Sequence, residues 1–257
     1  MKYAEYRKKP LRTNTVLLTS YYGSSFSDSI YYIAKELLQE KDVTVYVGTN
    51  SIKREQTFIH FNHLQPILVD VNSEKYLEII ATAQYLICNS RFPSFFFKRK
   101  DQVYLNTWHG TPLKTLGKDM RSGLKDVGNN QTNFLMCDYL LYPNEYTRKN
   151  IMSSFFLDRL YHGKVIMCGY PRNAAFFAPE DAALIREKMR LTNKRVYLYM
   201  PTWRGESLDT AEIAAYTEEL EYLLETLDEL LDDDIIIFVK LHQVVMRKIK
   251  IKQYRHF

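Results

Sequence analysis

The chain has 257 residues, of which 46% are hydrophobic and 14% aromatic, and it carries a formal net charge of +5 at pH 7. This composition supplies enough apolar surface for a packed core and excludes an intrinsically disordered chain, while the length fits one large or two small domains. No apolar run approaches the roughly 18–20 residues of a membrane-spanning helix and no signal peptide precedes the first predicted strand, so a cytoplasmic protein is expected.

The first part of the chain alternates short apolar runs with helical patterns. Strands are predicted at 15–20, 43–47, 67–69 and 85–88, with helices starting near residue 28 and at Ser73. Ser27 or Asp28 can cap the first helix, and the turn around Gly23 before it is either an ordinary turn or an anion contact. Strands that alternate with helices at this spacing predict a parallel sheet in a doubly wound α/β domain.

A strand at 103–105 leads into a segment that reads NTWHGTPLKTLGKDM. Because open α/β sheets place their chemistry in the loops after the carboxyl ends of strands, this segment is the first candidate site. Its candidate residues are His109, Gly110, Thr111, Lys114 and Lys118. Gly110 lets the backbone approach a ligand closely or take a positive φ. The two lysines either attract an anionic substrate or are solvated side chains, and an imidazole beside them suits a reaction in which a proton must be moved.

The rest of the chain completes one domain and begins another. Residues 119–133 are polar and predict a long mobile or functional loop, and the apolar run 134–142 is followed by a helix near 146 and a strand at 165–168. The pattern then restarts with a helix at 179–191 and strands at 195–200 and 235–241. Between these strands lies an amphipathic helix whose predicted buried side is Ala214, Leu220, Leu223, Leu224, Leu227 and Leu230. We therefore predict one domain at 1–175 and a partial second domain at 176–257.

Four segments carry a resemblance to a known family. They are WHGTPLKTLG at 108–117, NSRFP at 89–93, CGYPRN at 168–173 and PTWR at 201–204. Together they resemble the CDP-glycerol glycerophosphotransferase family of teichoic acid primases and polymerases. The resemblance implies a GT-B-like fold, in which two Rossmann-like doubly wound domains face a cleft, with the second domain incomplete here. It also implies transfer of glycerol phosphate or ribitol phosphate from CDP-glycerol or CDP-ribitol to a hydroxyl of a lipid-linked polyol-phosphate acceptor.

The resemblance implies roles for individual residues as well. His109 matches the family's first essential histidine and is the expected general base, and His242 matches the second, which would face the pyrophosphate as a donor or acid, although Gln243 follows it where the family tends to have proline. The expected substrate-binding residues are Gly110, Thr111, Lys114, Lys118, Arg91, Arg172, Thr202 and Arg204. For Arg172 and Arg204, a phosphate contact and a structural salt bridge both remain open. No cofactor and no tightly held metal is expected, because no carboxylate pair or histidine cluster has metal-ligand spacing.

Other interpretations of the same residues stay open. The chain can be a truncated, catalytically silent fragment that acts as an acceptor-binding module, or a nucleotide-sugar glycosyltransferase of the same fold. A nucleic-acid partner is not expected, since no recognition helix or aromatic and basic RNA motif is present. The excess basic residues gather near the two termini and predict peripheral attachment to the anionic inner face of the cell membrane. Cys88, Cys137 and Cys168 lack metal-binding spacing and are predicted core residues in a reducing compartment.

Overall fold

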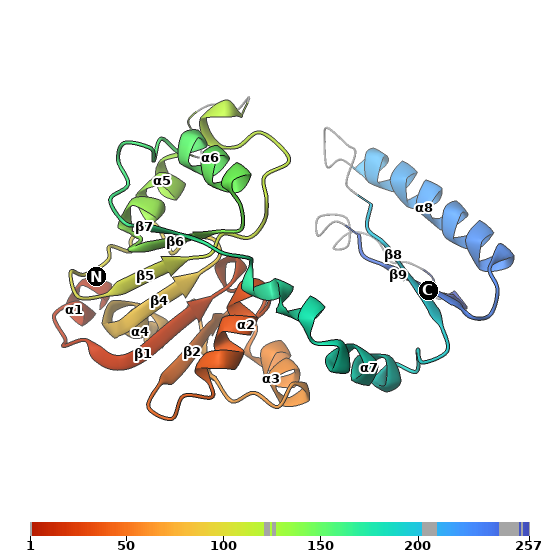
Figure 1. The fold of residues 1–257 in the computed structure, drawn as a ribbon, viewed down its shortest axis with the longest axis horizontal. Helices are drawn as coiled ribbons and strands as arrows, with labels where there is room; N and C mark the ends of the chain where they lie inside the picture. The colour runs from red at the N-terminus through yellow and green to blue at the C-terminus, as the bar shows by residue number, and fades with distance from the viewer. Residues whose placement is uncertain are drawn as a thin grey trace. The chain divides into compact units, whose positions relative to one another are not determined.

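The computed structural model of the chain describes residues 2–120, 124, 127–201, 210–241, 252 and 254–256. It divides into two compact units, Met1–Phe177 and Ala178–Phe257 (Figure 1). Three candidate site residues, Thr202, Arg204 and His242, lie outside the described residues.

The first unit is built on a parallel sheet of seven strands in the order β3-β2-β1-β4-β5-β6-β7 (Figure 1). The strands are β1 (Arg12–Thr19), β2 (Thr44–Thr49), β3 (Ile67–Asp70), β4 (Ala83–Cys88), β5 (Val103–Asn106), β6 (Tyr139–Tyr142) and β7 (Lys164–Met167). The direction in which strands are added reverses between β1 and β4. The carboxyl ends of these two strands are therefore a topological switch point, where doubly wound sheets bind their ligands.

Helices cover both faces of this sheet, as the strand spacing predicts. The α-helices are α1 (Lys2–Tyr6), α2 (Asp28–Leu37), α3 (Ile52–Phe61), α4 (Glu74–Thr82), α5 (Val127–Met136) and α6 (Glu145–Ser154). The 3₁₀ helices described in this unit are η1 (Tyr21–Gly23), η2 (Gly117–Asp119) and η4 (Pro171–Phe177). Successive residues of β1 point to opposite faces: Leu17 belongs to the core cluster under α4, α5 and α6, whereas Val16 and Leu18 belong to the cluster under α2. The predicted doubly wound α/β sheet is confirmed.

Three α-helices of the first unit were not predicted: α1, α3 and α5. Residues 52–61 form α3, although their amphipathic pattern is weak, since Phe61 is 63% exposed and Glu55 is buried. Much of the predicted loop at 119–133 is instead α5, whose polar residues are poor helix formers. Tertiary hydrogen bonds hold α5 in place: Asn133 Oδ1 accepts from Phe92 N at 2.9 Å, and Gln131 Nε2 donates to Phe155 O at 3.0 Å.

The second unit contains α7 (Pro179–Lys188), β8 (Arg195–Tyr199), α8 (Thr210–Leu230) and β9 (Ile235–Val239), with β8 and β9 parallel. The predicted apolar side of α8 is only partly buried. Leu220 and Leu224 are 4% and 0% exposed, whereas Leu223 and Leu230 are 37% and 76% exposed and Ala214 is also exposed. The prediction was wrong at these last positions, because within the described residues the sheet against α8 has two strands and covers only a narrow stripe of the helix.

Two further observations concern the whole described chain. Cys88 and Cys137 are buried as predicted, but Cys168 is exposed, because it follows the last strand of the first unit at the rim of the sheet. No helix among the described residues is both long and apolar enough to cross a bilayer.

Candidate active site

The segment after β5 turns sharply at Trp108. The Trp108 N–H donates to Asn106 Oδ1 at 2.8 Å, and Trp108 itself takes the left-handed conformation, with φ of 52°. The positive φ that was one expectation for Gly110 is therefore found two residues earlier, and Gly110 does not have it. A Cβ placed on Gly110 would meet open space, so the other expectation, close approach of a ligand, is compatible with the structure.

His109 follows Trp108 and is held by its ring nitrogen Nδ1. This atom lies 2.7 Å from the backbone oxygen of Asn89, and the imidazole stacks on Trp108 with ring centroids 4.1 Å apart. A carbonyl oxygen only accepts, so Nδ1 must carry the hydrogen. In the neutral imidazole the lone pair is then on Nε2, which is the arrangement that a general base requires.

The surroundings of His109 keep the imidazole neutral. Burial lowers the pKa of His109, and the Arg172 guanidinium lowers it further, while the hydrogen bond to Asn89 and the Asp28 carboxylate act in the opposite direction. Because the pKa is below that of an ordinary histidine, the basic form of the side chain predominates at pH 7.

A cluster of residues surrounds His109 and consists of Tyr21, Tyr22, Asp28, Asn89 and Arg172. Its buried anion is Asp28, the first residue of α2, whose side chain is 4% exposed. Its Oδ2 accepts from the Tyr21 hydroxyl at 3.0 Å and from Asn89 Nδ2 at 2.8 Å, and its Oδ1 accepts from Arg172 Nη1 at 3.0 Å. Sequence reasoning treated Asp28 only as a possible helix cap. No local pattern could reveal its role, because its partners are 7, 61 and 144 residues away in the chain.

Arg172 lies in η4 and joins two parts of the cluster. Its Nη1 donates both to Asp28 Oδ1 and, at 2.8 Å, to the backbone oxygen of His109. Its guanidinium also lies over the Tyr170 ring, 4.5 Å from the centroid. The structure shows one of the two roles left open for Arg172, the salt bridge, which it makes to Asp28 through Nη1.

Tyr21 and Tyr22 form the opposite side of the cluster, in η1 after β1. Both have left-handed backbones, with φ of 46° and 59°, and the Tyr21 ring meets His109 edge-on at 5.8 Å. Tyr22 is 57% exposed, and the Arg91 guanidinium lies 5.5 Å from its ring centroid. Strained residues of this kind persist only where the surrounding structure holds them, and they concentrate at functional sites.

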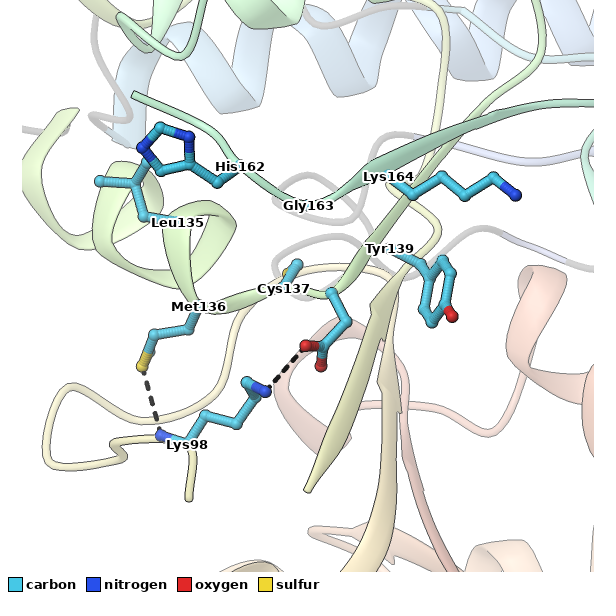
Figure 2. Close-up of a pocket in the computed structure, with 9 residues that line it drawn as sticks. Lys98, Leu135, Met136, Cys137, Tyr139, His162, Gly163 and Lys164 are labelled. Carbon is cyan, nitrogen blue, oxygen red and sulfur yellow. Dashed lines mark hydrogen bonds and ion pairs between the residues drawn. The ribbon is translucent and has the colours of Figure 1, made fainter. Parts of the chain in front are cut away.

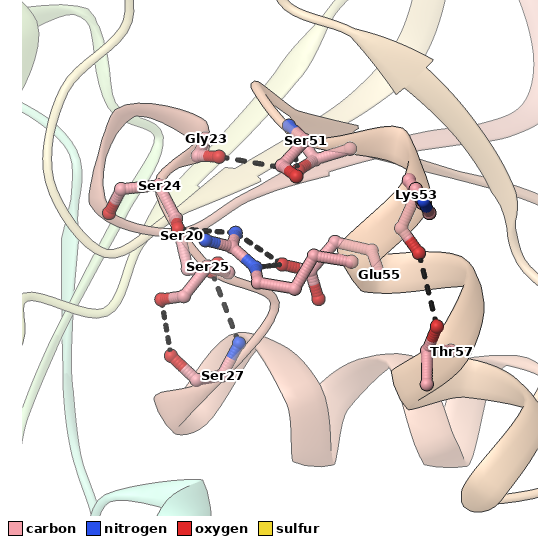
Figure 3. A network of polar contacts seen from close by, with 11 residues as sticks. Ser20, Gly23, Ser24, Ser25, Ser27, Ser51, Lys53, Glu55 and Thr57 are labelled. Atoms are coloured by element: carbon pink, nitrogen blue, oxygen red, sulfur yellow. Dashed lines mark hydrogen bonds and ion pairs between the residues drawn. The ribbon is translucent and has the colours of Figure 1, made fainter.

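A polar network holds this strained turn (Figure 3). Thr49 Oγ1 donates to Gly23 O at 3.4 Å, and the Asn50 N–H donates to the same oxygen at 2.8 Å. The Ser20 hydroxyl donates to Ser25 O, and its oxygen accepts from the Ser27 N–H at 3.3 Å. The ends of β1 and β2 and the start of α2 therefore fix the backbone that carries the two tyrosines.

The remaining predicted residues of the segment lie further along it. Thr111 Oγ1 is 3.3 Å from Thr147 Oγ1 and ties the segment to α6. Lys114 lines a hollow of about 310 Å³ beside α6, and Lys118 pairs with Asp119 at 2.9 Å. The structure therefore places Gly110 and Arg172 next to His109 and Arg91 next to Tyr22, whereas the two lysines belong to the surface beside α6.

A second hollow, of about 540 Å³, lies at the amino ends of β6 and β7 (Figure 2). It is lined by Tyr139 and Lys164, the first residues of β6 and β7, and by a Lys98–Asp138 ion pair of 2.9 Å. Because His109 follows the carboxyl end of β5, this hollow at the amino ends of parallel strands is separate from the candidate active site.

Comparisons with known proteins agree with the geometry. Residues 1–257 match the family described as CDP-Glycerol:Poly(glycerophosphate) glycerophosphotransferase. The chain is 31% identical over 271 residues to the teichoic acid poly(glycerol phosphate) polymerase of Bacillus spizizenii, covering 96% of this chain and 64% of that protein. It is 29% identical over 249 residues to the teichoic acid glycerol-phosphate transferase of Staphylococcus aureus, covering 92% of this chain and 61% of that protein.

A solved structure of a variant of the wall teichoic acid polymerase TagF, soaked with CDPG, aligns with a TM-score of 0.72 at 24% identity. The alignment covers 96% of this chain and 61% of that one. This likeness confirms the predicted GT-B-like α/β fold class. The chain spans 61% to 64% of the length of these relatives.

Proposed function

The chain belongs to the CDP-glycerol:poly(glycerophosphate) glycerophosphotransferase family, and on that premise we propose that it transfers a polyol phosphate from a CDP-activated donor to a teichoic acid acceptor. The donor is CDP-glycerol or CDP-ribitol, and the acceptor is a lipid-linked polyol phosphate with a free terminal hydroxyl. The observation that supports this best is the setting of His109: Nδ1 lies 2.7 Å from Asn89 O, which puts the hydrogen on Nδ1 and the lone pair on Nε2, and burial lowers the pKa and so favours the neutral imidazole.

In the proposed reaction, His109 Nε2 removes the proton from the acceptor hydroxyl. The hydroxyl oxygen forms a bond to the β-phosphorus of the donor, and the bond from that phosphorus to the bridging pyrophosphate oxygen breaks. CMP leaves, and a new phosphodiester remains on the acceptor. His242 would donate to the pyrophosphate as charge develops on the leaving oxygen.

The proposal assigns the acceptor to the domain at 1–175 and the nucleotide to the domain at 176–257. Arg91 and Tyr22 lie at the switch point, and an exposed aromatic ring next to a guanidinium suits a polyol phosphate, with Arg91 engaging phosphate oxygens. The other substrate contacts are proposed as the sequence predicts them: Gly110, Thr111, Lys114, Lys118, Arg172, Thr202 and Arg204.

A lipid-linked acceptor requires contact with the membrane, and the structure favours one surface for it. Of the basic residues at the amino terminus, Lys2 pairs with Glu74, and Lys9 pairs with Glu78 at 2.9 Å. Beside α6, exposed apolar side chains lie next to two lysines, one of which, Lys118, pairs with Asp119. The α6 patch consists of Leu113, Tyr146 and Phe156, which are 90%, 56% and 44% exposed, together with Lys114 and Lys118. We assign peripheral contact with the inner membrane face to this patch.

The experiment that tests the function is release of CMP from CDP-glycerol and CDP-ribitol by the purified chain with a lipid-linked acceptor analogue. Release that His109→Ala abolishes, and that His162→Ala leaves unchanged, supports the proposal; His162 is an exposed histidine outside the site and is the matched control. No release from a folded chain that still binds the acceptor favours the binding module. Turnover of a nucleotide sugar instead favours a glycosyltransferase.

A further inference from the structure

We infer that Asp28 is a positioning residue for His109: its buried carboxylate holds Asn89 and Arg172 so that His109 keeps its hydrogen on Nδ1 and presents Nε2 to the acceptor. The catalytic meaning of this inference rests on the proposed function, but the arrangement itself does not. Asp28 acts through its neighbours, because it contacts the groups that hold His109 and not the imidazole.

The first step of the argument concerns the carbonyl that fixes the imidazole. The backbone oxygen of Asn89 accepts from His109 Nδ1, so the direction of this carbonyl decides which ring nitrogen is protonated. The Asn89 side chain is fully buried and held at both ends: Nδ2 donates to Asp28 Oδ2 at 2.8 Å, and Oδ1 accepts from the Tyr21 N–H at 2.9 Å. Without the carboxylate, the amide loses its acceptor and the peptide next to it can turn.

The second step concerns the backbone of His109. Arg172 Nη1 bridges Asp28 Oδ1 and the backbone oxygen of His109, so the carboxylate fixes the guanidinium and the guanidinium fixes the backbone of the imidazole. The side chain of Arg172 is 33% exposed and cannot be held by burial alone. Asp28 therefore determines both contacts that orient the base.

The third step concerns charge. The groups that face His109 are Tyr21 from η1, Asp28 from α2, Asn89 after β4 and Arg172 from η4, and among them Asp28 and Arg172 are the charged pair. Their effects on the imidazole are opposite in sign, because a nearby anion favours imidazolium and a nearby cation disfavours it. Removal of one or the other should therefore shift the titration of His109 in opposite directions.

The test is ¹H–¹⁵N NMR of the full chain labelled with ¹⁵N-histidine, which reports the tautomer and the titration of each histidine without any turnover. The His109 signal is assigned by its loss in His109→Gln, and the signals of His60, His63 and His162 are internal controls. The variants are Asp28→Asn and Arg172→Met, with Asp158→Asn as the matched control, since Asp158 is an exposed carboxylate away from the cluster. Circular dichroism confirms that each variant is folded.

The expected wild-type result is a His109 with its hydrogen on Nδ1. Asp28→Asn should lower the pKa of His109 and raise the share of the Nε2–H tautomer, Arg172→Met should raise the pKa, and Asp158→Asn should change neither. An Nε2–H tautomer in the wild type, or pKa shifts of the same sign in the first two variants, would overturn the inference. Shifts of the same sign would indicate that both substitutions disturb the packing around His109 and that the opposite charges do not determine its pKa.

A second variant covers the case in which Asp28→Asn does not fold. Asn89→Ala keeps the carbonyl that accepts from His109 but removes the amide that ties it to Asp28, so a tautomer ratio unchanged from the wild type would overturn the inference. In an active preparation, Asp28→Asn should lower kcat by about tenfold or more with KM nearly unchanged. If the proposed function fails, turnover is absent in every variant while the NMR result still decides the role of Asp28.

Discussion

His109 combines two properties at the residue scale: its Nδ1 donates to a backbone carbonyl, and burial lowers its pKa. A base of this kind works in its neutral form. We therefore expect kcat/KM of the transfer to stay level through neutral pH and to fall only below about pH 6.5, where the imidazole takes up a proton. A pH profile of CMP release measures this, and a fall that begins well above neutrality would contradict the assignment of His109 as base.

The same suppressed pKa has a consequence for stability. The unfolded chain binds a proton at His109 more readily than the folded chain, so stability from this residue is complete above about pH 6.5 and is lost as the pH falls toward the lower pKa of the folded state. His109→Gln should reduce the dependence of the unfolding free energy on pH in this range. Urea unfolding of both proteins at several pH values between about 5 and 7.5 checks it, and identical slopes would count against it.

At the residue scale, the sequence predicts a base, His109, but not the residues that hold it. The motif around His109 was specific enough to predict the general base and its place after a strand. Asp28 and Tyr21 were not assigned roles, because a carboxylate at a helix start and a tyrosine after a strand are ordinary features until the fold brings Asn89 and Arg172 to them. Three predicted residues, Thr202, Arg204 and His242, lie outside the described residues, and the roles of all the predicted site residues stay predictions.

At the scale of elements, the backbone of the segment that carries His109 is constrained at Gly117. Gly117 has φ of +52°, and a Cβ there would lie 2.2 Å from Ser154 O. Gly117→Ala should therefore destabilise the fold by about 2–4 kcal/mol. Gly128, in α5, is the control: a Cβ there meets open space, so Gly128→Ala should stabilise by about 0.5–1 kcal/mol. Chemical unfolding of both variants measures the difference, and equal effects would refute the steric argument.

The helix α6, which carries part of the α6 patch, begins with a capping contact. Asn144 Oδ1 accepts from the Thr147 N–H at 2.8 Å, so Asn144→Ala should cost about 1 kcal/mol. Ser51, at the start of α3, makes no such side-chain bond to its helix, and Ser51→Ala should cost clearly less. Thermal unfolding of the pair provides the comparison. A loss in Ser51→Ala as large as in Asn144→Ala would show that capping is not the cause.

Strands were easier to predict than helices in this chain. Each predicted strand of the parallel sheet has a counterpart in the structure, because apolar β-branched runs such as 43–47 have few alternatives to a buried strand. The helix α1 was missed because it has only 5 residues, and α3 because its amphipathic pattern is weak. The helix α5 was missed because tertiary hydrogen bonds hold it, and not an amphipathic pattern. The buried side of α8 was predicted too broadly. Its amphipathic pattern is present, but the described two-stranded sheet covers only a small part of the apolar side.

At the scale of the whole molecule, membrane contact through the α6 patch predicts a measurable dependence on charge. Flotation with anionic vesicles should recover the chain at low salt and less of it at high salt, since each lysine near an anionic surface contributes roughly 1 kcal/mol. Replacing Leu113 and Lys114 together with Ser should reduce recovery. The control replaces Ile67 and Lys164, an exposed apolar and an exposed basic residue of the sheet, in the same way. Equal recovery of both double variants would argue against the α6 patch.

The carboxylate of Asp28 joins η1, the end of β4, the His109 loop and η4, and so it links residues 144 positions apart in the chain. Each of these segments is held, directly or through Arg172, by a hydrogen bond of this network, and opening of η4 also removes the ion-pair partner of the buried carboxylate. In hydrogen exchange, the amides of these segments should therefore behave as one cooperative unit with a common opening free energy. The proposed base and the last segment of the first unit would then open and close together.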